Sequence, residues 1–278
     1  MQTISKLIDQ ATQRLHNTET ARLDSEVLLA DLLRQDRAFI FAHPEYLPDA
    51  AVIGDYQRLI NARRQGLPLA YLTGTKEFYS IPFSVNEATL IPRPETELLV
   101  ETALAHIAPD SRDSLLDLGT GSGAIAISIA KNRPQLQITA SDICSRALAV
   151  AQHNIRALAV SNVTTLQSDW FKRLHGRQFN MVLSNPPYIQ STDSCLSDSD
   201  IRHEPRLALD GGKTGLHCIH HILAHAQTCL YDRGMIIIEH GNTQARAVQQ
   251  SMTEHGYTDI QTLTDYAGHE RITLARKP

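Results

Sequence analysis

The hydrophobic positions of the first 73 residues recur at the spacing of amphipathic helices. Residues 4–15 place Ile, Leu and Ala three or four positions apart, and residues 27–33 carry a second apolar cluster of the same kind. Asp36 is a suitable N-cap for a short third helix, and Pro48 can open a fourth. The pattern predicts a small helical bundle over residues 1–73, with no evident chemistry of its own.

The spacing of hydrophobic positions changes after residue 74. Residues 78–85 place apolar side chains as a β-hairpin does, with the turn expected near residues 80–82. We expect residues 74–90 to form this hairpin and to connect the helical bundle to the rest of the chain.

From residue 91 onward, short apolar runs alternate with helical patterns. This alternation predicts an α/β domain with a parallel sheet over residues 91–278, in which the last two strands can pair antiparallel. The expected strands are residues 114–118, 136–141, 163–167, 179–184, 235–239, 258–263 and 271–274. The expected helices are residues 98–108, 124–131, 145–158, 216–231 and 243–254.

The composition fits a two-domain globular protein. The 278 residues suffice for two modest cores, and 42% hydrophobic with 20% charged residues is usual for such proteins. No apolar run is long enough to span a bilayer, and residues 1–15 lack a signal-peptide block, so we expect a cytoplasmic protein without a membrane partner. A net charge of −4 argues against a partner held mainly through its phosphates.

The cysteines and histidines predict neither a disulfide nor a metal site. The four cysteines lack C-x-x-C spacing and are expected to be reduced. His217, His221 and His225 share a helical face, but no acidic residue stands among them as in H-E-x-x-H. A surface or packing role is therefore favoured over metal binding.

The stretch Asn185-Pro186-Pro187-Tyr188 carries the most specific chemical signal. It follows the apolar strand of residues 181–184, and ligands bind at the carboxyl ends of strands in open α/β sheets. The amide of Asn185 can accept one N–H of a planar nitrogen, the carbonyl of Pro186 can accept a second, and Tyr188 can cover the flat face of the substrate. The alternative is a proline-rich loop that merely caps the strand, which the context disfavours.

A glycine-rich turn and two further strand ends predict a site for a nucleotide-like cofactor. Gly119-Thr120-Gly121-Ser122-Gly123 follows Asp117 where the first parallel strand turns into a helix, and glycines there let the backbone approach a ligand. Asp142 ends the next strand, where it can bind ribose hydroxyls or, alternatively, cap the following helix. Trp170 follows the third strand and either flanks an adenine ring or packs in the core.

Two cofactors compete for this arrangement, a nicotinamide dinucleotide and S-adenosylmethionine. The spacing G-x-G-x-G, in place of G-x-G-x-x-G, favours S-adenosylmethionine. Asp117 would lie near its positively charged amino-acid end. Glu95 and Glu97 either border the methionine end of the cofactor or cap the helix that follows them.

These motifs together resemble the amino-methylating class I methyltransferases, whose catalytic motif is Asn-Pro-Pro-Tyr or a close variant. Other segments look like the protein-(glutamine-N5) methyltransferases that modify peptide-chain release factors. The likeness covers nearly the whole chain, most strongly residues 74–276. Ser168-Asp169-Trp170-Phe171 adds to the likeness to the amino-methylating class. The segments that resemble the release-factor methyltransferases are Ile91-Pro92-Arg93-Pro94-Glu95-Thr96-Glu97, Glu204-Pro205, Glu239-His240-Gly241, Asp265-Tyr266 and Glu270-Arg271.

The resemblance implies a Rossmann-like, seven-stranded, mostly parallel sheet, with S-adenosyl-L-methionine as the cofactor. It also implies release factors as the protein partners and the glutamine of their Gly-Gly-Gln motif as the methyl acceptor. We expect a monomer that does not bind nucleic acid directly. The catalytic residues would be Asn185, Pro186 and Tyr188, with Pro187 also at the substrate. The cofactor-binding residues would be Gly119, Thr120, Gly121, Ser122, Gly123, Asp142, Trp170 and Asn185.

Two other functions stay open at this point. Methyltransferases that act on adenine-N6 or cytosine-N4 share the Asn-Pro-Pro-Tyr chemistry, but they extract a base from its stack and usually carry a basic surface. The chain is acidic overall, which disfavours that function. A non-catalytic scaffold that binds the cofactor is the second, and the intact tetrapeptide argues against it. The acidic loop of residues 191–200 has no assigned role.

Overall fold

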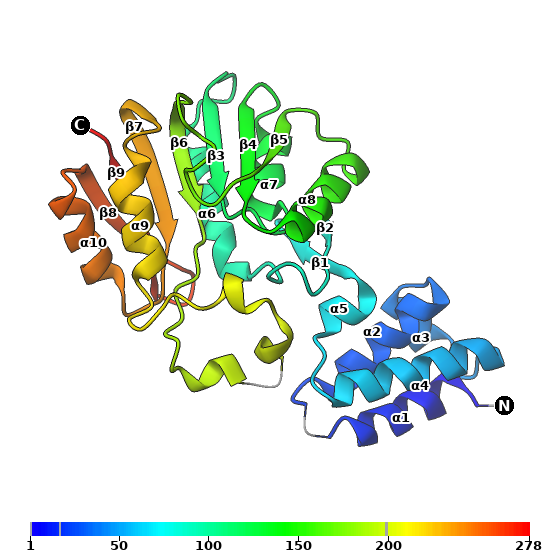
Figure 1. Cartoon of the computed structure of the whole chain (residues 1–278). Coiled ribbons are helices and arrows are strands. Elements are labelled where there is room, and N and C mark those ends of the chain that lie inside the picture. The colour runs from blue at the N-terminus through cyan, green and yellow to red at the C-terminus, as the bar shows by residue number, and fades with distance from the viewer. Residues whose placement is uncertain (1, 17, 198–199) are drawn as a thin grey trace. The chain divides into compact units, whose positions relative to one another are not determined.

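The computed structural model of the chain describes residues 2–16, 18–197 and 200–278. It divides into two compact units, both drawn in Figure 1. The first comprises Met1–Thr75 and Ser197–His203, and the second comprises Lys76–Leu196 and Glu204–Pro278. The division of the chain into residues 1–73, 74–90 and 91–278 stays a prediction. That prediction did not assign Ser197–His203 to the first unit, as the structure does.

Amphipathic helices form the first unit around one apolar core. Ile4, Leu28, Tyr56 and Ile60 are almost fully buried in it. The Tyr56 hydroxyl donates a hydrogen bond to the Ser25 carbonyl oxygen at 3.0 Å, so the one polar atom of this large side chain is satisfied. The helices are α1 (Ile4–Arg14), α2 (Ala21–Leu33), α3 (Arg37–Ala42), α4 (Ala50–Arg64) and α5 (Leu69–Thr73).

Aspartate N-caps set the starts of α3 and α4. Asp36 accepts a hydrogen bond from the Phe39 N–H at 2.8 Å, which confirms the predicted cap. The prediction that Pro48 opens α4 is wrong. Asp49 holds an extended conformation there and accepts from the Val52 N–H at 2.8 Å, so the carboxylate satisfies a free donor of the first turn.

A β-hairpin follows these helices, as predicted. Strand β1 (Thr75–Phe78) pairs with β2 (Ile81–Ser84), and Tyr79 and Ser80 form the turn with φ of 53° and 58°. Positive φ at both central residues is the geometry of a type I′ turn, whose twist matches that of the flanking strands. The turn begins one residue earlier than the sequence pattern indicated.

The second unit is built on a seven-stranded sheet in the order β5-β4-β3-β6-β7-β9-β8. Strands β3 to β7 run parallel, and β9 pairs antiparallel with both β7 and β8. This is the predicted fold class. The strands are β3 (Ser114–Leu118), β4 (Gln137–Asp142), β5 (Val163–Gln167), β6 (Phe179–Ser184), β7 (Leu230–Glu239), β8 (Thr258–Thr264) and β9 (Glu270–Arg276). The helices are α6 (Glu97–His106), α7 (Ala124–Asn132), α8 (Ser145–Ala157), α9 (His217–Ala226) and α10 (Ala245–Glu254), with short 3-10 helices η1 (Pro94–Thr96), η2 (Ser194–Ser197), η3 (Ile201–His203) and η4 (Arg206–Ala208).

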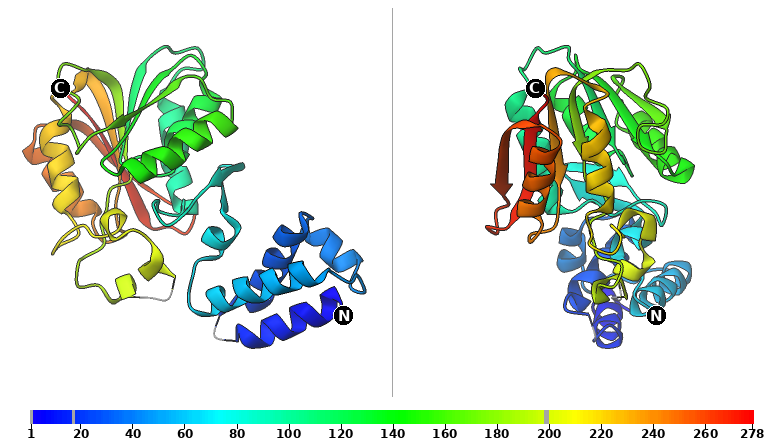
Figure 2. Two further views of the ribbon diagram at one scale, coloured as in Figure 1. Left: turned by 45° about the vertical axis from the view of Figure 1, so that its right-hand side comes forward. Right: turned by 60° about the vertical axis from the view of Figure 1, so that its left-hand side comes forward.

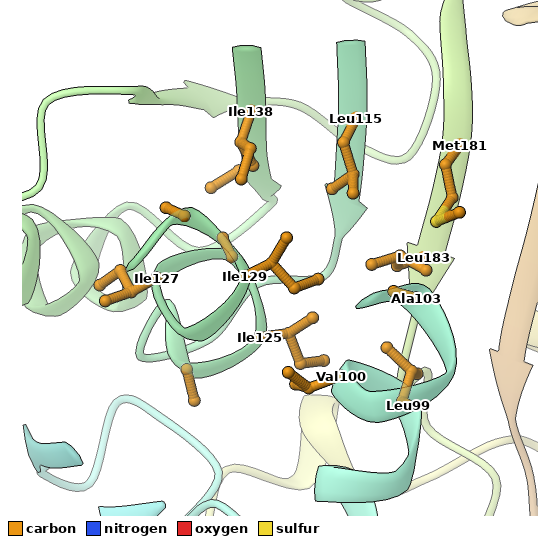
Figure 3. Packing of buried hydrophobic residues seen from close by; sticks show 14 of the residues in the cluster. Leu99, Val100, Ala103, Leu115, Ile125, Ile127, Ile129, Ile138, Met181 and Leu183 are labelled. Atoms are coloured by element: carbon orange, nitrogen blue, oxygen red, sulfur yellow. The ribbon is translucent and has the colours of Figure 1, made fainter. Parts of the chain in front are cut away.

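Both faces of the sheet are buried, because successive strand residues point to opposite sides. Leu115 and Met181 belong to the core under α6 and α7, and Figure 3 shows them among the labelled residues of this cluster. Leu116 and Val182, one position further along, belong to the core under α9 and α10. Figure 2 shows the sheet from two further sides, with helices on both of its faces.

The boundary between α9 and β7 differs from the expectation. The helix ends at Ala226 and does not continue to residue 231, and β7 begins at Leu230 and not at Met235. Leu230 pairs with Phe179 of β6 and is fully buried, so pairing in the sheet outweighs the local helical pattern.

Within the described ranges, no helix is both long enough and apolar enough to cross a membrane.

Candidate active site

The sheet topology brings the predicted site residues to one edge. The chain winds from β3 through β4 to β5 on one side, and then adds β6 and β7 on the other side of β3. The point between β3 and β6 is therefore a topological switch point, where open α/β sheets bind ligands at their carboxyl ends. Residues that follow β3, β4 and β6 meet there, as the sequence analysis expected.

The glycine-rich turn after β3 has the backbone conformation that its glycines allow. Gly119 and Gly121 have φ of 82° and 56°, in the left-handed region, and a Cβ at either position would meet no atom within 4 Å. The N–H groups of Gly119 and Thr120 both donate to the Ser141 carbonyl oxygen of β4, at 2.9 and 2.8 Å. The turn is thus fixed to the sheet on one side and open on the other.

Asp117 is a fully buried carboxyl group at the start of this turn. Its Oδ2 accepts a hydrogen bond from the Thr120 hydroxyl at 2.6 Å. Its Oδ1 is buried and has no hydrogen-bond partner in the part of the chain that the structure describes. Burial raises the pKa of Asp117 to about 7, against the hydrogen bond from Thr120, which lowers it.

Asp142 ends β4 and is hydrogen-bonded to the backbone through both carboxylate oxygens. Oδ2 accepts from the Gly121 N–H and Oδ1 accepts from the Cys144 N–H, each at 2.9 Å. Burial raises its pKa, while these backbone hydrogen bonds lower it. Cys144 is the N-cap residue of α8, so Asp142 supports the helix start without being the cap itself. Each oxygen keeps a lone pair for a further donor.

Trp170 lies in a left-handed conformation, with φ of 47°, which is uncommon for a bulky residue. The Ser168 hydroxyl donates to its carbonyl oxygen at 2.7 Å and helps hold this conformation. The half-buried indole packs against the core under α9 and lies 6.1 Å from the His221 ring. His221 in turn lies 4.4 Å from His225, and the described residues include no group of three potential metal ligands.

The tetrapeptide of residues 185–188 is anchored at both ends by side chains from other elements. The Asn185 side-chain NH₂ donates to the Thr96 hydroxyl at 3.0 Å. The Tyr188 hydroxyl donates to Oε1 of Glu239 at 3.2 Å. Burial, followed by the charge of Glu239, raises the pKa of Tyr188, so the phenol stays protonated.

The backbone of Tyr188 is held by Gln244 and by a close glycine contact. The Gln244 side-chain NH₂ donates to the Tyr188 carbonyl oxygen at 3.0 Å, and its Oε1 accepts from the Gly241 N–H at 2.8 Å. A Cβ at Gly215 would lie 2.3 Å from the same Tyr188 oxygen. These contacts leave the tetrapeptide backbone little freedom.

Carboxylates also organise the segment before α6. Oε2 of Glu204 accepts from the Ile91 N–H at 2.9 Å, and its Oε1 pairs with Arg93. Glu97 accepts from the Tyr79 N–H at 2.8 Å and so fixes the hairpin turn. Glu95 lies in the first turn of η1, where a negative charge complements the free N–H groups.

Comparison with known proteins identifies the family of this chain. A family model described as the methyltransferase small domain matches residues 94–200, and one described as the PrmC N-terminal domain matches residues 6–74. The release factor glutamine methyltransferase of Escherichia coli (strain K12) is 43% identical over 267 residues, which cover 96% of this chain and 96% of that protein. That of Salmonella typhimurium (strain LT2) is 43% identical over 269 residues, with 97% of each chain covered. The chain belongs to the release factor glutamine methyltransferase family.

The fold agrees with this family assignment. The crystal structure of a methyltransferase from Pyrococcus furiosus superimposes with a TM-score of 0.52 at 16% sequence identity, over 70% of this chain and 87% of that chain. At this identity the likeness concerns the fold alone, and it supports the class I methyltransferase architecture.

S-adenosyl-L-methionine, the cofactor of this family, fits the residues at the carboxyl edge. The buried, unpartnered Oδ1 of Asp117 suits a cationic amino group, and the open turn at Gly119 and Gly121 leaves room for a ligand to approach the backbone. Asp142 keeps acceptor capacity beside that turn.

Sequence reasoning did not assign the residues that hold the tetrapeptide. Thr96 and Glu239 stood in motifs that resemble the family, but their contacts with Asn185 and Tyr188 span 89 and 51 positions. Gln244 carried no signal beyond its place at the start of a predicted helix. Such contacts depend on strand register, which a single sequence does not state.

Proposed function

We propose that this chain transfers a methyl group from S-adenosyl-L-methionine to the side-chain amide nitrogen, N5, of the glutamine in the Gly-Gly-Gln motif of peptide-chain release factors. Relatives named release factor glutamine methyltransferase align over nearly the full length of the chain. The orientation of Asn185 is the structural observation that carries the proposal. Because its NH₂ group is bonded to Thr96, its Oδ1 is the atom left to accept a hydrogen bond from a substrate amide.

Asn185 and Pro186 orient the substrate nitrogen. A carboxamide nitrogen is a poor nucleophile, because its lone pair is delocalised into the carbonyl group. Oδ1 of Asn185 and the carbonyl oxygen of Pro186 each accept one N–H of the glutamine amide, which turns the lone pair toward the reacting carbon. Such placement lowers barriers by up to about 7–11 kcal/mol in well-oriented reactions.

When bound, S-adenosyl-L-methionine would supply an electrophilic methyl group for transfer to this nitrogen. No strong base is needed, since the methylated nitrogen is acidic enough to lose its proton afterwards. Tyr188 packs on the amide plane, and Pro187 keeps the backbone rigid beside it. The half-buried tetrapeptide limits the access of water to the reacting atoms.

The cofactor would be held by residues from four strand ends. Asp142 would accept hydrogen bonds from the ribose hydroxyls, Trp170 would hold the adenine, and Asn185 would contact both cofactor and substrate. The turn at the carboxyl end of β3 forms the remaining surface, with Gly119, Thr120, Gly121, Ser122 and Gly123.

The helical bundle of residues 1–73 recognises the release factor, residues 74–90 connect the two parts, and residues 91–278 carry the chemistry. Support for this division comes from the separate family-model match to residues 6–74. The chain acts as a monomer in the cytoplasm and does not bind nucleic acid directly. Its four free cysteines suit a reducing compartment.

Methyl transfer from labelled S-adenosyl-L-methionine to purified release factor, followed by peptide mapping of the modified residue, tests the proposed function. Label on the glutamine of the Gly-Gly-Gln motif is the expected result. Nucleic acid is offered in the same reaction. Label on that nucleic acid, with none on release factor, would contradict the proposed function and support methylation of an exocyclic amine. Label on neither would support a non-catalytic scaffold.

Replacing Asn185 with alanine should abolish turnover, because it removes an acceptor that orients the substrate nitrogen. Cofactor affinity should stay within about tenfold, which is under about 1.4 kcal/mol. Steady-state kinetics and calorimetry measure the two quantities. Asn132→Ala is the control, since that exposed side chain donates to the Ser128 carbonyl oxygen of its own helix. Near-normal turnover of Asn185→Ala would exclude the assigned role.

A further inference from the structure

His240 is a fully buried histidine directly after β7, and the mechanism above gives it no role. Its backbone N–H donates to the Arg271 carbonyl oxygen of β9 at 2.9 Å. Ile238 of β7 pairs in parallel with Ser184 of β6, so His240 follows its strand at the same edge of the sheet as residues 185–188. A buried imidazole needs hydrogen-bond partners, and those partners indicate what it does.

Both ring nitrogens of His240 have such partners. Nδ1 lies 3.0 Å from the Gly241 carbonyl oxygen, and Nε2 lies 2.8 Å from the Thr273 hydroxyl oxygen. Because a carbonyl oxygen can only accept, Nδ1 carries the hydrogen of the first contact. Burial lowers the pKa of His240, while the hydrogen bond to Gly241 raises it; the charge of Arg271 lowers it further and that of Glu270 raises it. The ring is therefore neutral at pH 7, and Nε2 is an acceptor.

Hydroxyl groups that donate in one direction hold the ring in this tautomer. Since Nε2 accepts, the Thr273 hydroxyl donates to it. The Thr262 hydroxyl lies 2.8 Å from that of Thr273, whose hydrogen is already used, so Thr262 donates to Thr273. The Gln249 side-chain NH₂ in turn donates to the Thr262 hydroxyl oxygen at 2.8 Å. This order of donors leaves the Nδ1 hydrogen of the ring for Gly241.

The Nδ1 hydrogen bond supports the turn that holds the tetrapeptide. The Gly241 carbonyl oxygen also accepts from the backbone N–H of Gln244 at 2.9 Å, and the Gly241 N–H donates to Oε1 of Gln244 at 2.8 Å. Gln244 is thus bonded to both sides of the glycine, and its side-chain NH₂ donates to the Tyr188 carbonyl oxygen at 3.0 Å. A continuous path of hydrogen bonds therefore runs from His240 through Gly241 and Gln244 to Tyr188.

We propose that His240 is a positioning residue that holds the tetrapeptide through Gly241 and Gln244, by means of its Nδ1 hydrogen. The inference rests on the proposed function, because a fixed Tyr188 backbone keeps residues 185–188 in place against the substrate amide. Without this donor the Gly241 peptide group gains freedom, since glycine has no Cβ to restrict it, and Gln244 shifts with it.

Two substitutions of His240 separate the Nδ1 contact from the rest of the ring. In His240→Asn the side-chain NH₂ can take the place of Nδ1, whereas in His240→Gln the longer amide reaches the place of Nε2. In steady-state kinetics on release factor, kcat of His240→Asn should stay within about threefold of the natural enzyme. That of His240→Gln should fall at least about tenfold, as displacement of reacting groups causes, with both KM values within about threefold. A merely structural role would lower kcat of both variants alike, and that result would contradict the proposal.

His255→Gln is the matched control and should change nothing. Nδ1 of the exposed His255 likewise contacts a backbone carbonyl oxygen, that of Ser251 at 2.8 Å, but at the opposite end of α10 from Gln244. If His240→Gln does not fold, His240→Phe takes its place, because it fills the space of the ring without a donor. The same loss of kcat is expected.

Coupling between His240 and Gln244 tests the path itself. Gln244→Met keeps the length of the side chain but removes both of its hydrogen bonds, so it should lower kcat at least about tenfold. Because the two residues act in series, His240→Gln in that background should lower kcat by less than about a further twofold. Losses that multiply would show that His240 acts by another route and would overturn the proposal.

A readout without catalysis distinguishes this proposal from the proposed function. In protein labelled with ¹⁵N-glycine, the backbone N–H of Gly241, assigned by its absence in Gly241→Ala, should exchange slowly with water. Exchange should become at least about tenfold faster in His240→Gln, but not in His240→Asn or His255→Gln. If the natural protein fails to methylate release factor while this exchange depends on His240, the function fails and the positioning stands. Activity on release factor with kcat and exchange both indifferent to His240 would overturn the positioning alone.

Discussion

Two aspartates at the carboxyl ends of β3 and β4 differ in how their charge is satisfied. Asp142 receives backbone N–H groups on both oxygens, whereas Asp117 has one hydroxyl donor and one buried oxygen without a partner. A fully buried carboxyl group with an unmet oxygen favours its protonated form, and burial raises the pKa of Asp117 to about 7. A cation placed against it would favour the ionised form instead.

Cofactor affinity should therefore depend on pH through Asp117. Because its pKa of about 7 is raised, the group is protonated at lower pH, and a cationic ligand must displace that proton. The dissociation constant of S-adenosyl-L-methionine should rise by up to about tenfold for each pH unit below 7. Calorimetry between pH 5.5 and 7.5 measures it. Asp117→Asn should bind more weakly at pH 7.5 and lose this dependence. A natural protein with pH-independent affinity would contradict the assignment.

At the residue scale, the sequence indicated which side chains follow the carboxyl ends of the strands but not how they are held. Asn185 and Tyr188 were found from a motif after an apolar strand, and the glycine-rich turn from its place between strand and helix. The link from Asn185 to Thr96 could not be predicted, because it depends on how residues 89 positions apart are brought together by the fold. The pKa of Asp117 likewise follows from complete burial, which no spacing in the chain states.

At the scale of elements, the loop after the tetrapeptide packs back onto it. The Gly211 N–H donates to the Ile189 carbonyl oxygen at 2.8 Å, and Ile189 N–H donates to the Leu209 carbonyl oxygen at 3.0 Å. Gly215, with φ of 74°, lies so close to Tyr188 that a side chain would meet both its carbonyl oxygen and Gln244. Gln244, directly before α10, and Gly215, at the end of this loop, thus both contact the carbonyl oxygen of Tyr188.

Gly215→Ala should lower both stability and turnover, because its Cβ would overlap the Tyr188 carbonyl oxygen and displace the tetrapeptide. Gly256→Ala is a matched control, since Gly256 has a similar φ of 77° but open space around it. Gly256→Ala should lower the free energy of unfolding by about 1–2 kcal/mol, the penalty of a left-handed alanine, and leave kcat unchanged. Gly215→Ala should cost more and reduce kcat at least about tenfold. Thermal unfolding and steady-state kinetics measure these effects. Equal behaviour of the two variants would show that the close approach is unimportant.

Element boundaries were predictable where hydrophobic pattern and sheet position agree. Strands β3, β5 and β6 begin and end at the predicted residues, since each is a short run bounded by polar or glycine-containing segments. The start of β7 was missed because Tyr231, Asp232 and Arg233 are exposed and interrupt its apolar run. They lie where the register between β7 and β6 shifts, between the pairs Leu230–Phe179 and Met235–Met181, and Arg233 has a left-handed φ of 62°.

At the scale of the whole molecule, the first unit contains a buried cation that pairs with two carboxylates. Arg63 of α4 bonds to Asp24 of α2 at 2.6 Å and to Asp200 at 2.8 Å. Arg63 and Asp24 are almost fully buried, whereas the Asp200 side chain is 46% exposed. The Arg63–Asp24 pair should therefore contribute more to stability than the Arg63–Asp200 pair.

Arg63→Met should destabilise the first unit by about 3–5 kcal/mol, because it leaves the Asp24 carboxylate buried without its counter-charge. Asp200→Asn should cost less than about 1 kcal/mol, since exposed charges are screened by water. Denaturant unfolding followed by the helical signal measures both. Similar costs for the two variants would show that burial does not set the strength of this network.

The first unit also carries exposed apolar side chains suited to the proposed recognition of the substrate protein. Phe41 and Leu47 are 58% and 48% exposed, on and just after α3. The double variant Phe41→Ser, Leu47→Ser should raise KM for intact release factor at least about fivefold, because the loss of a contact that contributes about 1 kcal/mol weakens binding by that factor. It should leave KM for a short Gly-Gly-Gln peptide unchanged. Tyr231→Ser, an equally exposed change on β7, is the control. An unchanged KM for intact release factor would exclude this face.

The return of Ser197–His203 to the first unit has a consequence for synthesis on the ribosome. Helices α1 to α5 emerge first, but Asp200 follows only after more than a hundred further residues. At 5–20 residues per second, translation of the intervening chain takes about 6–25 s. For that time Arg63 has Asp24 as its carboxylate partner within the nascent bundle, and the segment that follows residues 185–196 completes the first unit last.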